Sequence, residues 1–200
     1  MSIHVNSSLK LYMESAIAAP VAITAITKAA PGVLSATGHT FANGDTVLLE
    51  IQGMVELHGY LCKVVNVVAS TSFQVAGVDG TAGIDTTLFS TFSSGTAKKV
   101  TLGTSIVGVQ EFAFAGGEIK TTDTTTVNDT VDTQIVVGAT AQSADMTMQW
   151  DPSAAAQQAM ITAFKTRSNK GFKVLWPDGA FAMWYGTVGY TGAPGGGKQG

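Results

Sequence analysis

The sequence predicts a mainly β protein, a sandwich or barrel with one packing α-helix, an extended arm and an inserted small β domain. Glycine occurs 23 times, and Gly, Asn and Asp clusters separate short runs rich in Val, Ile and Thr; this pattern is typical of strands joined by tight turns. Of the 200 residues, 45% are hydrophobic and 12% charged, which is enough apolar material to bury a core. Only the segment "WDPSAAAQQAMITAFKTR" has convincing helical spacing.

Two changes in composition divide the chain. One lies near Pro20 and the other at "SSGTAKKV", where small, polar and basic residues separate two apolar regions. Between them, short β-rich runs alternate with turn signals such as Asn43-Gly44-Asp45. We predict a first strand of the main domain in residues 1–20, an inserted small β domain in 21–98, the main β domain with its helix in 99–194, and a flexible glycine-rich tail in 195–200.

The segment "KTTDTTTVNDTVDTQIVVGAT", residues 120–140, is too long and too polar for a hairpin loop in a compact domain, although Thr and Val favour strands. We interpret it as an extended arm that orders against a neighbouring subunit, and solvated disorder stays open as the alternative. The candidate contact residues of the arm are Lys120, Asp123, Asn128, Asp129 and Asp132.

The segment "SADMTMQW" alternates strictly between apolar and polar residues. Such a period of two predicts a half-buried strand. Its apolar side chains are Ala144, Met146, Met148 and Trp150. Its polar face consists of Asp145, Thr147 and Gln149.

The single helix is expected over about residues 151–167. Asp151 is a good N-cap and Pro152 fits the first helical position, while Gly171 is expected to end the element. Small residues at helical spacing let the helix lie close to a sheet, so it is a packing helix without chemistry. Its apolar stripe comprises Ala156, Ala159, Met160, Ala163 and Phe164.

A hairpin closed by Pro177-Asp178-Gly179 follows the helix, in "GFKVLWPDGAFAMWYGTV". Its strands carry large apolar side chains on both faces, and such a sheet must be covered twice. The helix supplies one cover. The predicted core-packing residues are Met160, Phe164, Trp176 and Trp184.

No catalytic or metal-binding constellation is predicted, and no cofactor. "GAPGGGKQG" resembles a phosphate-binding loop, but Gln199 replaces the required Ser or Thr and no helix follows. His58 and Cys62 lack an orienting third group, so Cys62 is expected in the core; an enzyme based on this pair is the least supported alternative.

Metal sites are not indicated by the remaining titratable residues. His4 and His39 have no partners at zinc-ligand spacing. The segment "DTTTVNDTVD", which holds Asp123, Asp129 and Asp132, lacks the glycine and the terminal glutamate of a calcium loop.

The charge of the chain argues against tight binding of nucleic acid. The net charge is -3 and the isoelectric point about 5.5, whereas phosphate contacts require a basic patch. The apolar run 16–22 is too short for a membrane span, and Lys10 and Glu14 disfavour a signal peptide. We therefore expect no membrane anchor.

Two parts of the chain resemble known families. "DMTMQWDPSAAAQQAMITAF" followed by "FKVLWPDGAFAMWYGTVGYTGAP" resembles the tail tube protein, or major tail protein, of long-tailed bacteriophages. This resemblance covers residues 101–194 and lies in the order of elements. Residues 23–83, including "GYLCKVVNV" and "STSFQVAGVDGTAG", resemble a small β module inserted in phage structural proteins, similar to the first catalytic-cysteine half-domain of ubiquitin-activating enzymes. In phage proteins the module implies no ubiquitin chemistry for Cys62.

The tail tube resemblance implies a structural subunit of the virion tail, assembled in the host bacterial cytoplasm. Subunits of that family form hexameric rings that stack into a tube, whose continuous inner β-barrel conducts DNA during ejection. The implied partners are further copies of the chain, tape measure and tail terminator proteins, and double-stranded DNA in passage. On this model Asp145, Thr147 and Gln149 face the lumen, and the inserted domain lies outside.

Two points stay open at this stage. The family continues with one more strand after "YTGAP"; the chain is a short member, or residues 2–13 fill that edge, or a neighbour does. The alternative function is another virion structural protein, namely a capsid decoration or a receptor- or glycan-binding β module.

Overall fold

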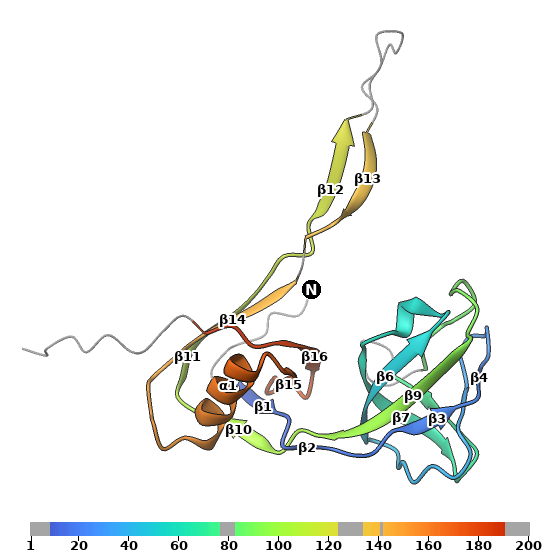
Figure 1. Ribbon diagram of the computed structural model, residues 1–200, viewed down its shortest axis with the longest axis horizontal. Coiled ribbons are helices and arrows are strands. Elements are labelled where there is room, and N and C mark those ends of the chain that lie inside the picture. Colours follow the sequence, from blue (N-terminus) through green and yellow to red (C-terminus); the bar gives the residue numbers. More distant parts are fainter. Residues whose placement is uncertain (1–8, 77–82, 124–133, 141, 191–200) are drawn as a thin grey trace, which may run out of the picture. The chain divides into compact units, whose positions relative to one another are not determined.

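The computed structural model describes residues 9–76, 83–123, 134–140 and 142–190. Within these residues the protein is mainly β, with antiparallel sheets and the single α-helix α1, which confirms the predicted fold class (Figure 1). The chain divides into two units, one formed by residues 1–106 with 152–200 and the other by residues 107–151.

A four-stranded antiparallel sheet in the first unit has the order β10 (Thr104–Ile106), β1 (Lys10–Met13), β15 (Asn169–Leu175), β16 (Phe181–Thr187). The N-terminal strand β1 therefore lies between two strands from much later in the chain. The sheet buries side chains along its two central strands because alternate residues point to one face. These are Leu11, Met13, Phe172 and Val174.

The predicted hairpin is confirmed in β15 and β16. The Trp176 N–H donates to the carbonyl of Ala180 at 2.9 Å, and the Gly179 N–H donates to the carbonyl of Trp176 at 3.0 Å. Gly179 has a φ of 88°, a conformation that glycine adopts without steric cost. The Pro-Asp-Gly sequence thus fixes the register of this edge of the sheet.

Helix α1 (Ala155–Thr166) begins later than predicted. Asp151 does not cap it; the N-cap is Ala154, which makes no side-chain capping bond. Residues 152 and 153 form a turn instead, and the Gln158 side chain donates to the carbonyl of Pro152 at 2.7 Å. The carbonyl of Pro152, which the sequence places in the first turn of the helix, thus accepts a hydrogen bond from a side chain.

The end of α1 also differs from the expectation. Arg167 adopts the left-handed conformation, with a φ of 52°, and the N–H of Ser168 donates to the carbonyl of Ala163 at 3.0 Å. Gly171 does not end the helix but lies buried in β15. A Cβ at Gly171 would lie 3.4 Å from carbons of Leu61, Val100 and Leu102, so the glycine permits close packing.

The buried face of α1 comprises Ala156, Gln157, Met160 and Ala163. The prediction that Phe164 is a core residue is wrong for the subunit, since its side chain is 43% exposed. Phe164 lies in the last turn, on the flank of the stripe, 6.0 Å from the Tyr190 ring centroid. Trp176 and Trp184 are half-buried, and Trp184 stacks on Phe172 with ring centroids 5.5 Å apart.

Substitutions at two apolar positions of α1, one buried and one exposed, should therefore differ in their effect on the free energy of unfolding. We expect Met160→Asp to lower the free energy of unfolding by more than about 3 kcal/mol, because it places a carboxylate in the buried stripe. Phe164→Asp should cost less than about 1 kcal/mol, because that position already contacts solvent. Urea denaturation of both variants measures the difference; equal losses would contradict the described helix face.

The larger sheet of the first unit is formed by residues 16–101 and has the order β2-β9-β6-β7-β8-β5-β4, with β3 also paired to β9. Its core centres on Phe73, which contacts the rings of Phe41 and His39. The assignment of residues 21–98 to a separate inserted domain, and its likeness to the ubiquitin-activating module, stay predictions. The strands are β2 (Ala16–Ile17), β3 (Val21–Ile23), β4 (Ala25–Ile26), β5 (Leu34–Ser35), β6 (Thr46–Gln52), β7 (Leu61–Val68), β8 (Ser72–Val75) and β9 (Ser94–Thr101), with the 3₁₀ helix η2 (Val55–Leu57) after β6.

The second unit consists of two antiparallel strand pairs. β11 (Val109–Ala115) pairs with β14 (Ser143–Met148), and β12 (Ile119–Asp123) pairs with β13 (Gln134–Ala139). The sequence predicts an extended arm in residues 120–140 rather than a hairpin, whereas both ends of this segment pair with each other. The described Thr and Val residues of β12 and β13 thus lie in strands that pair with each other, which satisfies backbone groups locally.

The predicted contact residues of the arm are only partly within the described chain. Lys120 lies opposite Gly138, and Asp123 lies opposite Gln134 in the register of β12 and β13. Asn128, Asp129 and Asp132 lie outside the described residues. Their contact with a neighbouring subunit stays a prediction.

Candidate assembly surfaces

The pairing of β11 with β14 forms a two-stranded ribbon whose faces differ in chemistry. Directly opposed residues of an antiparallel pair point to the same side. Phe112 lies opposite Met146 and Phe114 opposite Ala144, while Asp145 lies opposite Ala113. Hence one face is apolar and the other polar.

The apolar ribbon face carries two aromatic side chains, one of which is exposed. The rings of Phe112 and Phe114 meet edge to face with centroids 4.9 Å apart, and Phe114 is 52% exposed. A ribbon of two strands cannot bury such a face by itself. We define the apolar ribbon face as Val109, Phe112, Phe114, Ala144, Met146 and Met148.

The polar ribbon face includes two of the residues predicted for a lumen. Along β14 the side chains alternate between exposed and half-buried, which confirms the strand that the sequence predicts. Asp145 and Thr147 are exposed on it. Gln149 follows the end of the strand, is exposed, and its backbone N–H donates to the carbonyl of Gly108 at 2.8 Å.

Sequence reasoning missed Glu111, which the register places on the polar face opposite Thr147. The alternation in "EFAFA" carries the signal, because it separates Glu111 from the two phenylalanines with a period of two. We define the polar ribbon face as Glu111, Ala113, Ala115, Ser143, Asp145 and Thr147. These six residues include two acids and no base.

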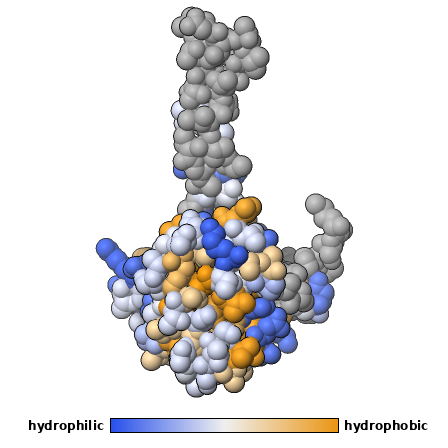
Figure 2. Space-filling view, turned by 90° about the vertical axis from the view of Figure 1, so that its right-hand side faces the viewer, coloured by the Kyte–Doolittle hydropathy of each residue, from blue (hydrophilic) through white to orange (hydrophobic). Residues whose placement is uncertain are grey.

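Apolar side chains are also exposed at the end of the first unit that carries the larger sheet. Figure 2 views that end and shows apolar residues between polar ones. They come from different loops and strands, and single exposed apolar residues are common on protein surfaces. The exposed large residues of this sheet and its loops are Ile17, Val55, Tyr60, Val68 and Leu88.

His39 and His58 lie within hydrogen-bond distance of backbone carbonyls, and Cys62 lies in the core. The Nδ1 atom of His58 lies 2.9 Å from the carbonyl oxygen of Ile51, and Nε2 of His39 lies 3.2 Å from that of Ser72. Cys62 is buried, and burial raises the pKa of its thiol to about 12. A thiol that stays protonated at neutral pH is a poor nucleophile, so the core role expected for Cys62 fits its environment.

The burial of Cys62 predicts slow labelling by a thiol reagent. In the native protein we expect the reaction with an aromatic disulfide at pH 8 to be at least about a hundredfold slower than in urea, because only unfolding exposes the thiolate. Absorbance of the released thiolate measures the rate. Fast stoichiometric labelling without urea would show that Cys62 is accessible and reopen the catalytic alternative.

The described residues offer neither a metal-binding cluster nor a helix that could span a membrane. Across the described ranges, no three His, Cys, Asp or Glu side chains are grouped closely enough to hold a metal ion. His4 lies outside these ranges. The described helices are too short or too polar to cross a membrane.

Comparison with known proteins places most of the chain in one family. A family model described as phage tail tube protein matches residues 53–198, which is more than half of the chain. The match includes the whole of residues 101–194, whose order of elements resembles that family, and it begins within the larger sheet. A comparison with curated proteins gives no match.

Proposed function

The chain belongs to the phage tail tube protein family, and from this premise we propose that it forms stacked rings around a channel for DNA. As a member of that family it is a structural component of the phage tail. The proposal concerns the finer points: how copies associate, which surface lines the channel and what passes through it.

The observation that carries the proposal is the ribbon of β11 and β14. Within the described residues β11 and β14 form a sheet of two strands, and a sheet this small can take up further strands at its edges. Edges of this kind pair with edges of neighbouring copies, and closure of such a sheet into a barrel removes all of them. The two unlike faces of the ribbon suit a wall with an aqueous inner side and a covered outer side.

The charge of the polar ribbon face supports passage of DNA. Glu111 and Asp145 are its charged members, and both are acidic. Basic residues would bind phosphates and release counterions, which holds DNA in place. An acidic or neutral wall repels the polyanion slightly and lets it slide. We therefore assign Asp145, Thr147 and Gln149, together with Glu111, to the lumen.

The proposal extends to the assembly. We infer hexameric rings, with the β12–β13 hairpin reaching across subunits or between rings. Tape measure and tail terminator proteins are the proposed partners at the interior and the end of the tube. Assembly in the host bacterial cytoplasm precedes incorporation into the virion.

Electron microscopy of the purified chain tests this function. Negative staining at increasing protein concentration should reveal rings and then hollow tubes of constant diameter. Sedimentation of the same samples measures the fraction assembled. Particles that stay monomeric at every concentration reached would overturn the proposal.

A further inference from the structure

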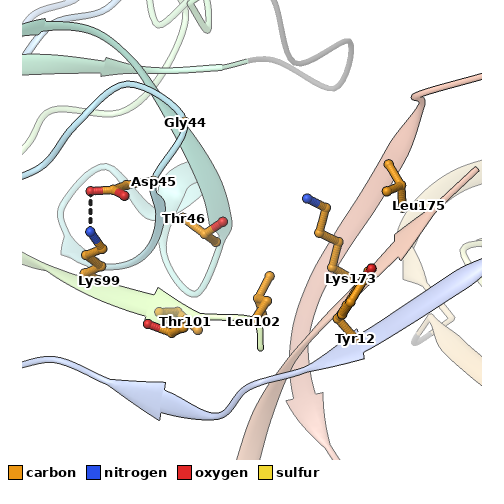
Figure 3. Close-up of a pocket in the computed structure, with 10 residues that line it drawn as sticks. Tyr12, Gly44, Asp45, Thr46, Lys99, Thr101, Leu102, Lys173 and Leu175 are labelled. Atoms are coloured by element: carbon orange, nitrogen blue, oxygen red, sulfur yellow. Dashed lines mark ion pairs between the residues drawn. The ribbon is translucent and has the colours of Figure 1, made fainter. Parts of the chain in front are cut away.

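A pocket of about 350 Å³ lies between the two sheets of the first unit. Tyr12, Lys173 and Leu175 enter it from the four-stranded sheet, and Asp45, Thr46 and Lys99 line the opposite wall (Figure 3). The remaining lining residues are Gly44, Val100, Thr101 and Leu102. The pocket therefore combines groups brought together from strands that are far apart in the sequence.

One pair of charges in this pocket is already neutralised. The Nζ of Lys99 lies 2.8 Å from Oδ2 of Asp45, which also accepts the N–H of Ala42 at 2.9 Å. Burial acts to raise the pKa of Asp45, but the hydrogen bonds from Lys99 and Ala42 outweigh it, and the pKa is lowered. Asp45 is thus ionised at neutral pH, and its negative charge is neutralised by the ion pair with Lys99.

Lys173 on the other wall has no such partner. Among the described residues, no carboxylate lies within ion-pair distance of Lys173 or of the nearby Lys63. Both ammonium groups lie over the ring of Phe181, at 5.3 Å from its centroid for Lys173 and 5.6 Å for Lys63. Burial, followed by the charge of Lys63, lowers the pKa of Lys173. Two positive charges without a carboxylate partner among the described residues therefore share one aromatic ring, and one of the two, Lys173, lines the pocket.

The rest of the lining indicates the class of ligand. The hydroxyl groups of Tyr12 and Thr101 are hydrogen-bond donors, and Val100, Leu102 and Leu175 are apolar. The Thr46 hydroxyl instead contacts Sδ of Met183, at 3.7 Å. An ammonium group with hydroxyl donors and apolar neighbours suits a carboxylate on a short aliphatic stem.

We propose that this lysine pocket, defined by Lys173, Tyr12 and Thr101 with Lys63 on the same Phe181 ring as Lys173, binds a carboxylate side chain from a second copy of the chain. The chain carries 14 acidic and 11 basic side chains, so its copies repel one another on average. A local positive pocket gives acidic subunits an attractive and orienting contact. The inference rests on the proposed self-assembly and names one contact of it.

Carbodiimide cross-linking of an equimolar mixture of ¹⁴N- and ¹⁵N-labelled chains tests the contact. The reagent activates a carboxylate; the amine of a contacting lysine then attacks the carbonyl carbon, which forms an amide and releases the reagent as a urea. Mass spectrometry should find mixed-isotope peptides joined through Lys173 or Lys63. Lys173→Gln should remove the Lys173 products and raise the concentration needed for assembly about tenfold.

The matched control is Lys165→Gln, an exposed lysine on α1, which should assemble like the wild type. Titration with inorganic phosphate tests whether the ligand of the pocket is a free oxyanion rather than a carboxylate side chain of a second copy. Phosphate that protects Lys173 from an amine reagent, with no interchain product at Lys173 or Lys63, would overturn the second-copy occupant.

The outcomes separate this inference from the proposed function. Tubes that form without cross-links at these lysines, and at the same concentration for Lys173→Gln, overturn the inference and leave the function standing. Small oligomers joined through Lys173, without any tubes, support the inference and overturn the function. Absence of both tubes and interchain products overturns both.

Discussion

Phe73→Ala should lower the free energy of unfolding by about 3 to 5 kcal/mol, the cost of deleting a buried aromatic side chain. Phe73 is fully buried, lies opposite Leu34 in the pairing of β8 with β5, and meets the Phe41 ring at 5.2 Å between centroids. Its removal leaves a cavity that the surrounding strands fill only in part. Urea denaturation followed by circular dichroism measures the loss.

Phe114→Ala is the matched control for this substitution. Phe114 is 52% exposed and lies in the other unit, so the same chemical change should cost less than about 1 kcal/mol. If both variants lost equal stability, the core of the larger sheet would not lie where the structure places it.

The second large effect concerns assembly. The double substitution Phe112→Ser and Phe114→Ser should leave the first unit folded but raise the concentration needed for tube formation by at least about tenfold. Phe112 is already half-buried and Phe114 is 52% exposed, so covering what remains of both side chains contributes about as much as one full burial, about 1.5 to 3 kcal/mol. Each 1.4 kcal/mol is a factor of ten. Sedimentation and electron microscopy measure the assembled fraction.

The polar ribbon face provides the control for this variant. Glu111→Gln with Asp145→Asn changes the opposite side of the same strands, and such chains should still form tubes. Normal assembly of the double serine variant would show that the apolar ribbon face is not covered in the tube. Loss of assembly in the polar variant would mean that its carboxylates make contacts rather than line a channel.

Local pattern predicted the strands and the hairpin well. The period of two in "SADMTMQW" and the Pro-Asp-Gly turn both act over a few residues, so neither depends on distant partners. The start of α1 was missed because Asp151 and Pro152 satisfy a local capping rule, whereas the helix begins at Ala155. The prediction that Phe164 is buried is wrong because helical spacing identifies the apolar stripe but does not show which of its residues are buried.

Contacts between distant segments could not be predicted from the sequence. The buried carboxylate of Glu14 accepts the Nζ of Lys170 at 2.9 Å and the N–H of Gly171 at 3.2 Å, across more than 150 residues. From the sequence alone, Glu14 indicates only that a signal peptide is disfavoured; nothing there predicts that it is buried or that it pairs with Lys170. Likewise, no periodicity indicates that Lys173 shares the Phe181 ring with Lys63.

The most direct measurement is a helical reconstruction of the assembled tube by electron cryomicroscopy. We expect a hollow tube whose inner wall is a continuous barrel containing β11 and β14, with Glu111, Asp145 and Thr147 facing the lumen. A tube with these side chains on its outer surface, or a filament without a channel wide enough for double-stranded DNA, would contradict it.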